Sequence, residues 1–423
     1  MLASEINDNK RAKRNIVIFC AYRFLSRFYM YLPILAILLY KHNLSYVFIS
    51  YVLAIHGISI MIYKAPLEFL VKKFKYQKTV VLIGEIIKTI GILTLALSQG
   101  DLYYLLLGQM LSGMGFALTS SVESSLLFNS MKEGKQEDRY REIEAKSQSF
   151  SFVSILISGV IGSIIAAINT SYPLFLSAPF SLISGILILL FRETPSIVAP
   201  EKSVDTRTKQ KNQIQKDIKS TSHYLTYYAF NRALILLIFV FVLPLYLFNE
   251  FNVNLALMGT ILGLFSFSSY IIANKLEKVT KFIGKEIIWI VPPVVLLYAI
   301  LFMVIKNIAF LVAIPVFFGI AVAIVRPLAM GRINEMISDN RSIVMSRGEQ
   351  LFGFLNGAFL IAAGYTLFYY GIDVVLYLLL LISVIGNISL VFVFKNKEKN
   401  EEEVTKEDVI KGSKKDIKKE MNK

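Results

Sequence analysis

Residues 102–130 read LYYLLLGQMLSGMGFALTSSVESSLLFNS, an apolar stretch that is rich in small residues and carries a single charged side chain, Glu123. A helix needs about 20 predominantly apolar residues to cross the hydrocarbon core of a bilayer. The stretch therefore predicts a membrane-spanning helix. Its glycines and serines favour close packing against neighbouring helices. A carboxylate at this depth is costly, so Glu123 needs an explanation.

The rest of the chain repeats this pattern. Hydrophobic residues make up 55% of the sequence and charged residues 18%, a balance that excludes an ordinary soluble domain. We predict an all-α membrane protein with twelve transmembrane helices. The expected spans are 15–40, 47–71, 79–99, 102–130, 148–168, 172–191, 229–249, 255–275, 287–305, 308–331, 343–370 and 373–394.

The net charge of +15 is concentrated in alternate loops between these stretches. By the positive-inside rule, the basic loops lie in the cytoplasm. We therefore predict a multi-pass protein of the inner or plasma membrane, with both termini cytoplasmic and Asn169–Ser171 outside. The lipid bilayer is the expected partner of the basic loops, and nucleic acid is not. The single Cys20 and three scattered histidines indicate no metal site and no cofactor.

The spans divide into two sets of six. The predicted organisation is an N-terminal six-helix bundle over 1–191, a cytoplasmic linker over 192–222, a C-terminal six-helix bundle over 223–394 and a charged cytoplasmic tail over 395–423. The distal part of the linker is expected to form a helix on the membrane surface. The tail has too few apolar residues to bury a core, so disorder or a frayed helix is expected there.

Two stretches carry a resemblance to a known family, the major facilitator superfamily. The first is GMGFALTSSVESSLLFNSM at 113–131, which is similar to the end of the family's fourth span. The second resembles the exit of the family's tenth span and comprises Arg326-Pro327, Asn334, Arg341 and Ser346. The resemblance covers roughly residues 15–394. It implies two pseudo-symmetric six-helix bundles, with spans one, four, seven and ten lining the centre.

Charged residues fall within these central spans. Arg23 and Arg27 are four residues apart, which places both guanidinium groups on one face of a helix, and Tyr31 continues that face. Span four adds Glu123, and spans seven and ten add Arg232 and Arg326. One interpretation is a site for an anionic or zwitterionic group, with Glu123 as an ion-pair partner or a protonatable group. The alternative is a set of ion pairs that hold the helices together.

Other charges lie in the peripheral spans and near the loops. Glu85 and Lys88 are three apart in span three, and a local ion pair is favoured there, with Glu85 as a second candidate proton carrier. Arg347 and Glu349 begin span eleven, where contacts with loop ends are expected. By spacing or by resemblance, a gating role is predicted for Lys64, Glu68, Lys72, Lys73, Asn129, Asn334 and Arg341. The usual Gly and Asp of the family's gating loop are replaced here.

These observations predict a monomeric secondary active transporter that works by alternating access. It would move a small organic solute such as a drug, peptide or metabolite, most simply by proton-coupled export. No enzyme activity is expected, because the sequence shows no metal or nucleophile constellation and no phosphate-binding loop. Uptake of an anionic metabolite is the alternative within this class. A non-transporting membrane receptor or scaffold is the alternative from another class.

Overall fold

The computed structural model describes the backbone of residues 2–420, apart from 72–73, 75, 137–138, 194–203, 285–286, 311–312 and 338–340. Side-chain contacts are described within residues 11–390. The α-helices are α1 (Leu2–Leu25), α2 (Leu35–Lys41), α3 (Tyr46–Val71), α4 (Gln77–Ala96), α5 (Leu102–Glu133), α6 (Tyr140–Ile168), α7 (Tyr172–Ile188), α8 (Val204–Leu237), α9 (Leu243–Phe251), α10 (Leu255–Ile283), α11 (Val291–Ile305), α12 (Ala313–Met336) and α13 (Arg341–Glu420).

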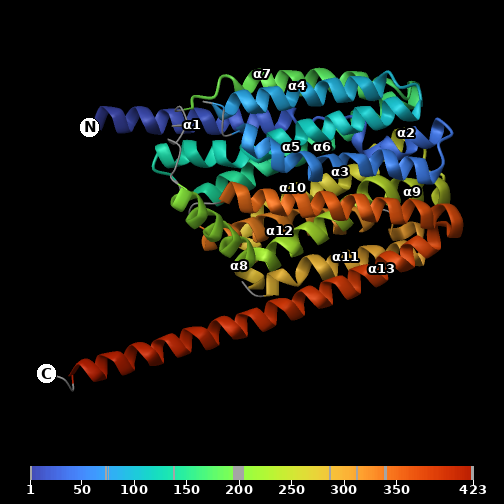
Figure 1. Cartoon of the computed structure of the whole chain (residues 1–423). Helices are drawn as coiled ribbons and strands as arrows, with labels where there is room; N and C mark the ends of the chain where they lie inside the picture. Colours follow the sequence, from blue (N-terminus) through green and yellow to red (C-terminus); the bar gives the residue numbers. More distant parts are fainter. Residues whose placement is uncertain are drawn as a thin grey trace.

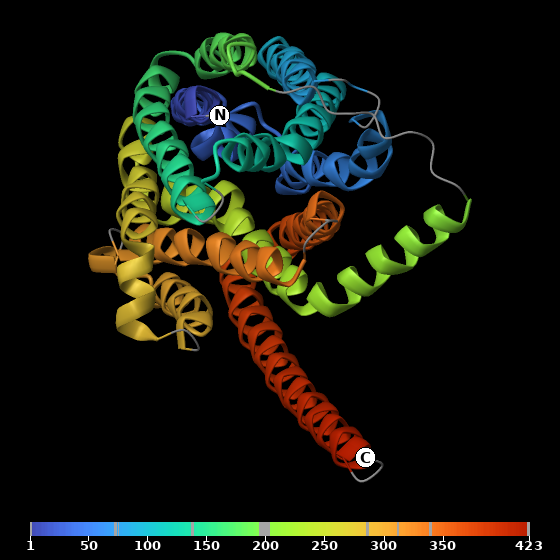
Figure 2. The ribbon, with the colours of Figure 1, turned by 90° about the vertical axis from the view of Figure 1, so that its left-hand side faces the viewer.

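The helices run side by side in a bundle, and both termini extend from the same end, called here the terminal end (Figure 1). The opposite end is called the distal end. Seen from the terminal end, α1–α7 form one half of the bundle and α8–α13 form the other (Figure 2). The all-helical membrane fold predicted from the sequence is confirmed.

Eight helices in the described part of the chain are long and apolar enough to cross a membrane, and three shorter apolar helices lie among them. The last of the eight covers Ile343–Leu390 and contains both of the last two predicted spans. Gly371 separates them, because its φ of +81° and ψ of 179° reverse the chain within a single residue. The helix then continues past residue 395, into the segment for which disorder or a frayed helix was predicted.

The predicted first span is not one continuous helix. α1 ends at Leu25, residues 26–31 are non-helical, and a 3-10 turn at Leu32–Ile34 leads into α2. Pro33 explains part of this interruption, since it lacks an N–H and its ring clashes with the carbonyl four residues earlier. The prediction of an unbroken helix over 15–40 was therefore wrong.

Neighbouring helices satisfy the backbone groups that the interruption leaves free. The Ser177 hydroxyl of α7 accepts a hydrogen bond from Met30 N at 2.9 Å, and the Ser154 hydroxyl of α6 donates one to Phe24 O at 2.5 Å. Gly162 packs directly against the interruption, because a Cβ at this position would lie 1.9 Å from Met30 O. Non-helical backbone at this depth is tolerated only with such partners.

The seventh span has its own irregularity. α8 begins at Val204, inside the predicted linker, and runs without interruption into this span. Residues Ile238–Val242 then form a π-helical turn, which ends two residues before Pro244. This turn lies against the 3-10 turn of the first span. Irregular turns in the first helix of each half therefore meet where the halves join, and such turns often mark functional sites.

Most of the packing between the halves comes from α3 against α13 and from α6 against α10. At the distal end the contacts are between uncharged groups. The rings of Tyr40 and Phe248 meet edge to face with centroids 6.2 Å apart, Asn249 donates a hydrogen bond to Tyr46 Oη at 3.2 Å, and Ser163 donates one to Ala256 O at 3.2 Å.

Candidate functional site

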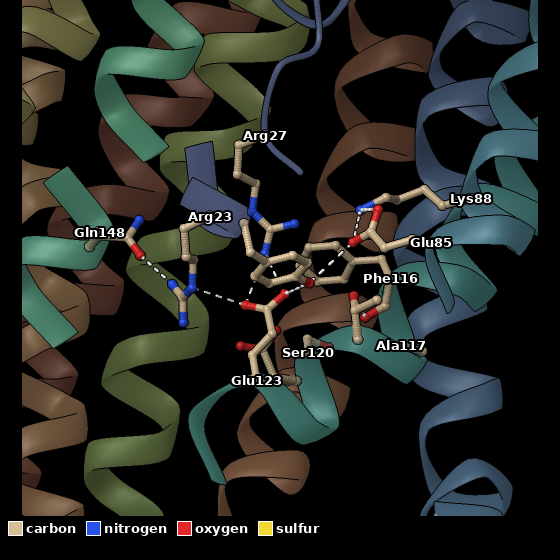
Figure 3. Close-up of polar contacts among 12 residues, drawn as sticks. Arg23, Arg27, Glu85, Lys88, Phe116, Ala117, Ser120, Glu123 and Gln148 are labelled. Carbon is tan, nitrogen blue, oxygen red and sulfur yellow. Dashed lines mark hydrogen bonds and ion pairs between the residues drawn. The ribbon is translucent and has the colours of Figure 1, made fainter. Parts of the chain in front are cut away.

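Glu123 lies at the centre of a polar network in the first half (Figure 3). Its carboxylate is 3.2 Å from Arg23 Nε and 3.2 Å from Arg27 Nη2. The Arg23 side chain is fully buried, that of Glu123 is 3% exposed and that of Arg27 is 13% exposed. The structure thus brings together three residues that the sequence selected from spans one and four.

Arg23 contacts charged and polar side chains of two neighbouring helices. Besides Glu123, its guanidinium contacts Glu144 at 3.1 Å and donates a hydrogen bond to Gln148 at 3.0 Å, both on α6. It also lies over the Phe19 ring, 5.0 Å from the centroid. These contacts tie α1 to α5 and α6, and they match the alternative in which ion pairs hold the helices together.

Arg27 is held less completely. It follows the end of α1, within the interruption of the first span. Its Nη2 donates to Glu123, and its guanidinium lies over the Phe116 ring at 5.0 Å. Its Nη1 is buried and has no hydrogen-bond partner among the residues that the structure describes. One nitrogen of this guanidinium therefore has hydrogen-bond donors that no described residue uses.

Glu85 belongs to the same network. It forms the predicted ion pair with Lys88 at 2.7 Å, and it accepts a hydrogen bond from the Ser181 hydroxyl at 2.8 Å. The Tyr22 hydroxyl lies 3.1 Å from Glu85 Oε1 and 3.0 Å from Glu123 Oε1. The two candidate proton carriers are therefore joined through one phenol. Figure 3 shows this chain of contacts running from Gln148 to Lys88.

The second half has a smaller network. Arg232 on α8 pairs with Glu349 on α13 at 2.7 Å, and the Tyr228 hydroxyl donates to the same carboxylate at 2.7 Å. The Arg232 guanidinium lies 4.0 Å from the centroid of the Phe352 ring. Glu349 was predicted to contact loop ends, but it is buried, because the start of α13 packs against α8.

Arg326 on α12 differs from the other central arginines. It is half-buried and forms no ion pair or hydrogen bond with the residues described. It is nevertheless close enough to interact electrostatically with Glu123 and Glu144 of the first half and with Glu349 of its own half. Arg326 therefore lies between the two networks.

Of the predicted gating residues, the structure describes the side chains of Lys64 and Asn129. Lys64 is buried and donates hydrogen bonds to the Ser120 hydroxyl at 2.8 Å and to Ala117 O at 3.3 Å, both on α5. Tyr31 is buried in the main hydrophobic core, and Asn129 is exposed. The positions outside the described side chains are Glu68, Lys72, Lys73, Asn334 and Arg341.

Members of the two networks that were not selected as site residues from the sequence include Tyr22, Glu144, Gln148, Ser181, Tyr228 and Glu349. A usable signal existed for Glu144 and Gln148, since they are four residues apart and share a helix face. They were missed because the fifth span was expected to begin at 148. Nothing local marks Tyr22 among the many tyrosines of the chain.

Comparisons with known proteins agree with this architecture. The model of one protein family, the Major Facilitator Superfamily, matches residues 19–308. The crystal structure of a mutant of the nucleoside transporter NupG superposes with a TM-score of 0.71 at 13% identity, covering 90% of this chain and 100% of that one. A second NupG crystal structure gives a TM-score of 0.65 at 13% identity, with 92% and 99% covered. No curated protein matches the chain.

Proposed function

This chain belongs to the Major Facilitator Superfamily and is a secondary transporter; we propose that it moves a small organic solute across the cell membrane by proton-coupled alternating access. The observation that carries the proton coupling is the position of Tyr22 between Glu85 and Glu123. The carboxyl groups of this site can accept protons, and its arginines can bind a solute. The basic loops and both termini are on the cytoplasmic side in this proposal.

Tyr22, Glu85 and Glu123 share few hydrogens among them. A phenol has one proton to donate, and Tyr22 Oη contacts an oxygen of each carboxyl group. If both carboxyl groups are ionised, only one of these contacts is a hydrogen bond. In the other, two oxygens are close together with no hydrogen between them. One proton added to either carboxyl group makes both contacts hydrogen bonds. The three groups therefore suit a single transferable proton.

Movement of that proton would change the ion pairs around it. A proton on Glu123 weakens its attraction to Arg23 and Arg27, and a proton on Glu85 weakens its attraction to Lys88. Because the Arg27 contact lies at the interruption of the first span, protonation would loosen the element that adjoins the π-helical turn of the other half. This provides a physical link between proton binding and rearrangement of the halves.

We propose export as the direction, because residues 113–131 resemble the fourth span of bacterial efflux-type members of the family. Uptake is the second candidate. The excess of arginine at the centre favours an anionic metabolite as its solute, and the superposed NupG structures are described as nucleoside transporters. A flux assay with right-side-out and inside-out vesicles distinguishes the two directions.

The test of coupling uses proteoliposomes that contain a pH-sensitive dye and are screened with a panel of labelled solutes under an imposed pH gradient. For a transported solute, Glu123→Gln and Tyr22→Phe should retain exchange but lose accumulation against a gradient. Tyr104→Phe is the matched control, because Tyr104 is 50% exposed. Normal accumulation by Tyr22→Phe would remove the phenol from the mechanism, and normal accumulation by Glu123→Gln would leave Glu85 as the carrier.

A further inference from the structure

The central charges of the described residues do not balance. Four guanidinium groups, those of Arg23, Arg27, Arg232 and Arg326, accompany three carboxylates, those of Glu123, Glu144 and Glu349. Lys88 and Glu85 form a balanced pair beside them, and Lys64 is left out of this count because the side chain of Glu68 is not among those described. One cation therefore has no carboxylate of its own.

Arg326 is that cation. The other three arginines each have a carboxylate oxygen at 3.2 Å or less, whereas Arg326 has none within 4.0 Å among the described residues. A guanidinium at membrane depth normally has a partner, because leaving it unpaired costs free energy. Arg326 is half-buried as a residue, so part of it remains exposed.

Arg27 supplies a second uncommitted donor. Its Nη1 is buried without a partner, whereas its Nη2 is held by Glu123. Arg27 belongs to the first half and Arg326 to the second, and Glu123 lies 3.2 Å from one and interacts electrostatically with the other. Arg27 and Arg326 therefore both have unused hydrogen-bonding capacity among the described residues, and both lie close to Glu123, one in each half.

We propose that Arg326 and Nη1 of Arg27 bind an anionic group of the transported solute, a carboxylate or a phosphate ester. The planar guanidinium matches both groups through paired N–H donors. The half-buried ring of Phe116 lies beside Arg27, so the rest of the solute would meet an aromatic side chain there. The solute class is thus a small organic anion with an apolar or aromatic part.

This inference rests on the proposed function, since it names the solute of the same site, but its test measures binding separately from flux. Purified protein in detergent is titrated calorimetrically with benzoate, phenyl phosphate and benzyl alcohol, which share a ring and differ in the polar group. The two anions should bind at least tenfold more tightly than the alcohol. The comparison of benzoate with phenyl phosphate identifies which anionic group the site prefers.

Variants locate the contact. Arg326→Gln and Arg27→Lys should each weaken binding of the preferred anion at least tenfold, the second because a lysine cannot reproduce the fork. Arg347→Ala is the matched control, since Arg347 is exposed and donates to Gln350. Equal binding of anions and alcohol by the unmodified protein overturns the inference without any variant, as does unchanged binding by Arg326→Gln.

The two proposals fail in different ways. If labelled neutral solutes cross vesicles and Arg326→Gln transports them normally, the anion site is wrong and the transporter remains. If anions bind through Arg326 but no solute crosses the vesicle membrane, the transport proposal is wrong and the anion site remains.

Discussion

Arg27 and Arg232 are arranged alike on opposite sides of the junction between the two halves. Each guanidinium lies over a phenyl ring, Phe116 at 5.0 Å and Phe352 at 4.0 Å, and each pairs with a glutamate of its own half. Within the described residues, every ion pair joins groups of the same half, and the hydrogen bonds between the halves join uncharged groups. The halves can therefore tilt against each other without separating a buried ion pair.

The Arg232–Glu349 pair makes a prediction about stability. Glu349→Gln should lower the free energy of unfolding by about 2–3 kcal/mol, because it leaves a largely buried guanidinium without its carboxylate. Adding Arg232→Gln should recover part of that loss. SDS denaturation in mixed micelles measures both. Lys281→Gln is the control, since its pair with Glu277 is about 80% exposed and should contribute little. Additive losses in the double variant would contradict the pairing.

The contact between Gly162 and the interrupted helix predicts a sharp difference between two glycines of α6. Gly162→Ala should lower the thermal midpoint by several degrees and reduce transport, because its Cβ would lie 1.9 Å from Met30 O. Gly159→Ala should be tolerated far better, since its nearest neighbour is a Pro33 ring carbon at 3.2 Å. Thermal unfolding in detergent gives the comparison, and equal midpoints would argue against a fixed interruption.

The distal end carries a titratable cluster. Lys306 contacts Asp373 at 2.7 Å and Glu250 at 2.8 Å, and these hydrogen bonds, that to Asp373 foremost, raise the pKa of the Lys306 ammonium above its ordinary value. A raised pKa of a cationic group stabilises the fold below the unfolded value, about 10.4, and this stabilisation is lost as pH rises through the folded value.

We therefore expect Lys306→Gln to lower the thermal midpoint at pH 7–9, and the difference from the unmodified protein to shrink above about pH 10.4. The effect should be small, about 0.5–1 kcal/mol, because the cluster is partly exposed. Lys306→Arg should keep most of the stability at pH 8. A difference that is constant up to pH 11 would mean that the charge is not what stabilises this end.

The predicted topology is tested by labelling single cysteines on intact cells with an impermeant reagent. The buried Cys20 is first replaced by alanine, and cysteines are then introduced at Thr170 and Gln210. Position 170 should be labelled from outside and position 210 only after permeabilisation, because the positive-inside rule places the basic segment in the cytoplasm. The reverse pattern would invert the orientation.

Hydropathy and charge were sufficient for the helical fold, because span length and loop charge are local properties of the chain. The interruption at 26–31 was missed, since its partners Ser177 and Gly162 come from α7 and α6 and cannot be read from the first span. The pairing of the site residues could not be predicted for the same reason. Arg23, Arg27 and Glu123 stand out singly as charges in apolar stretches, but which carboxylate each arginine meets depends on packing.

The distances along the chain between Arg27 and Glu123 and between Arg232 and Glu349, 96 and 117 residues, also bear on how the protein is made. During synthesis, the first span reaches the translocon with two arginines at a cost of about 2.5–3.5 kcal/mol each, and their carboxylate emerges only with the fourth. The carboxylate that pairs with Arg232 emerges only with the eleventh span. This order of synthesis predicts that each half moves fully into lipid only after the carboxylate that pairs with its arginine has been made. The N-terminal half is expected to do so first.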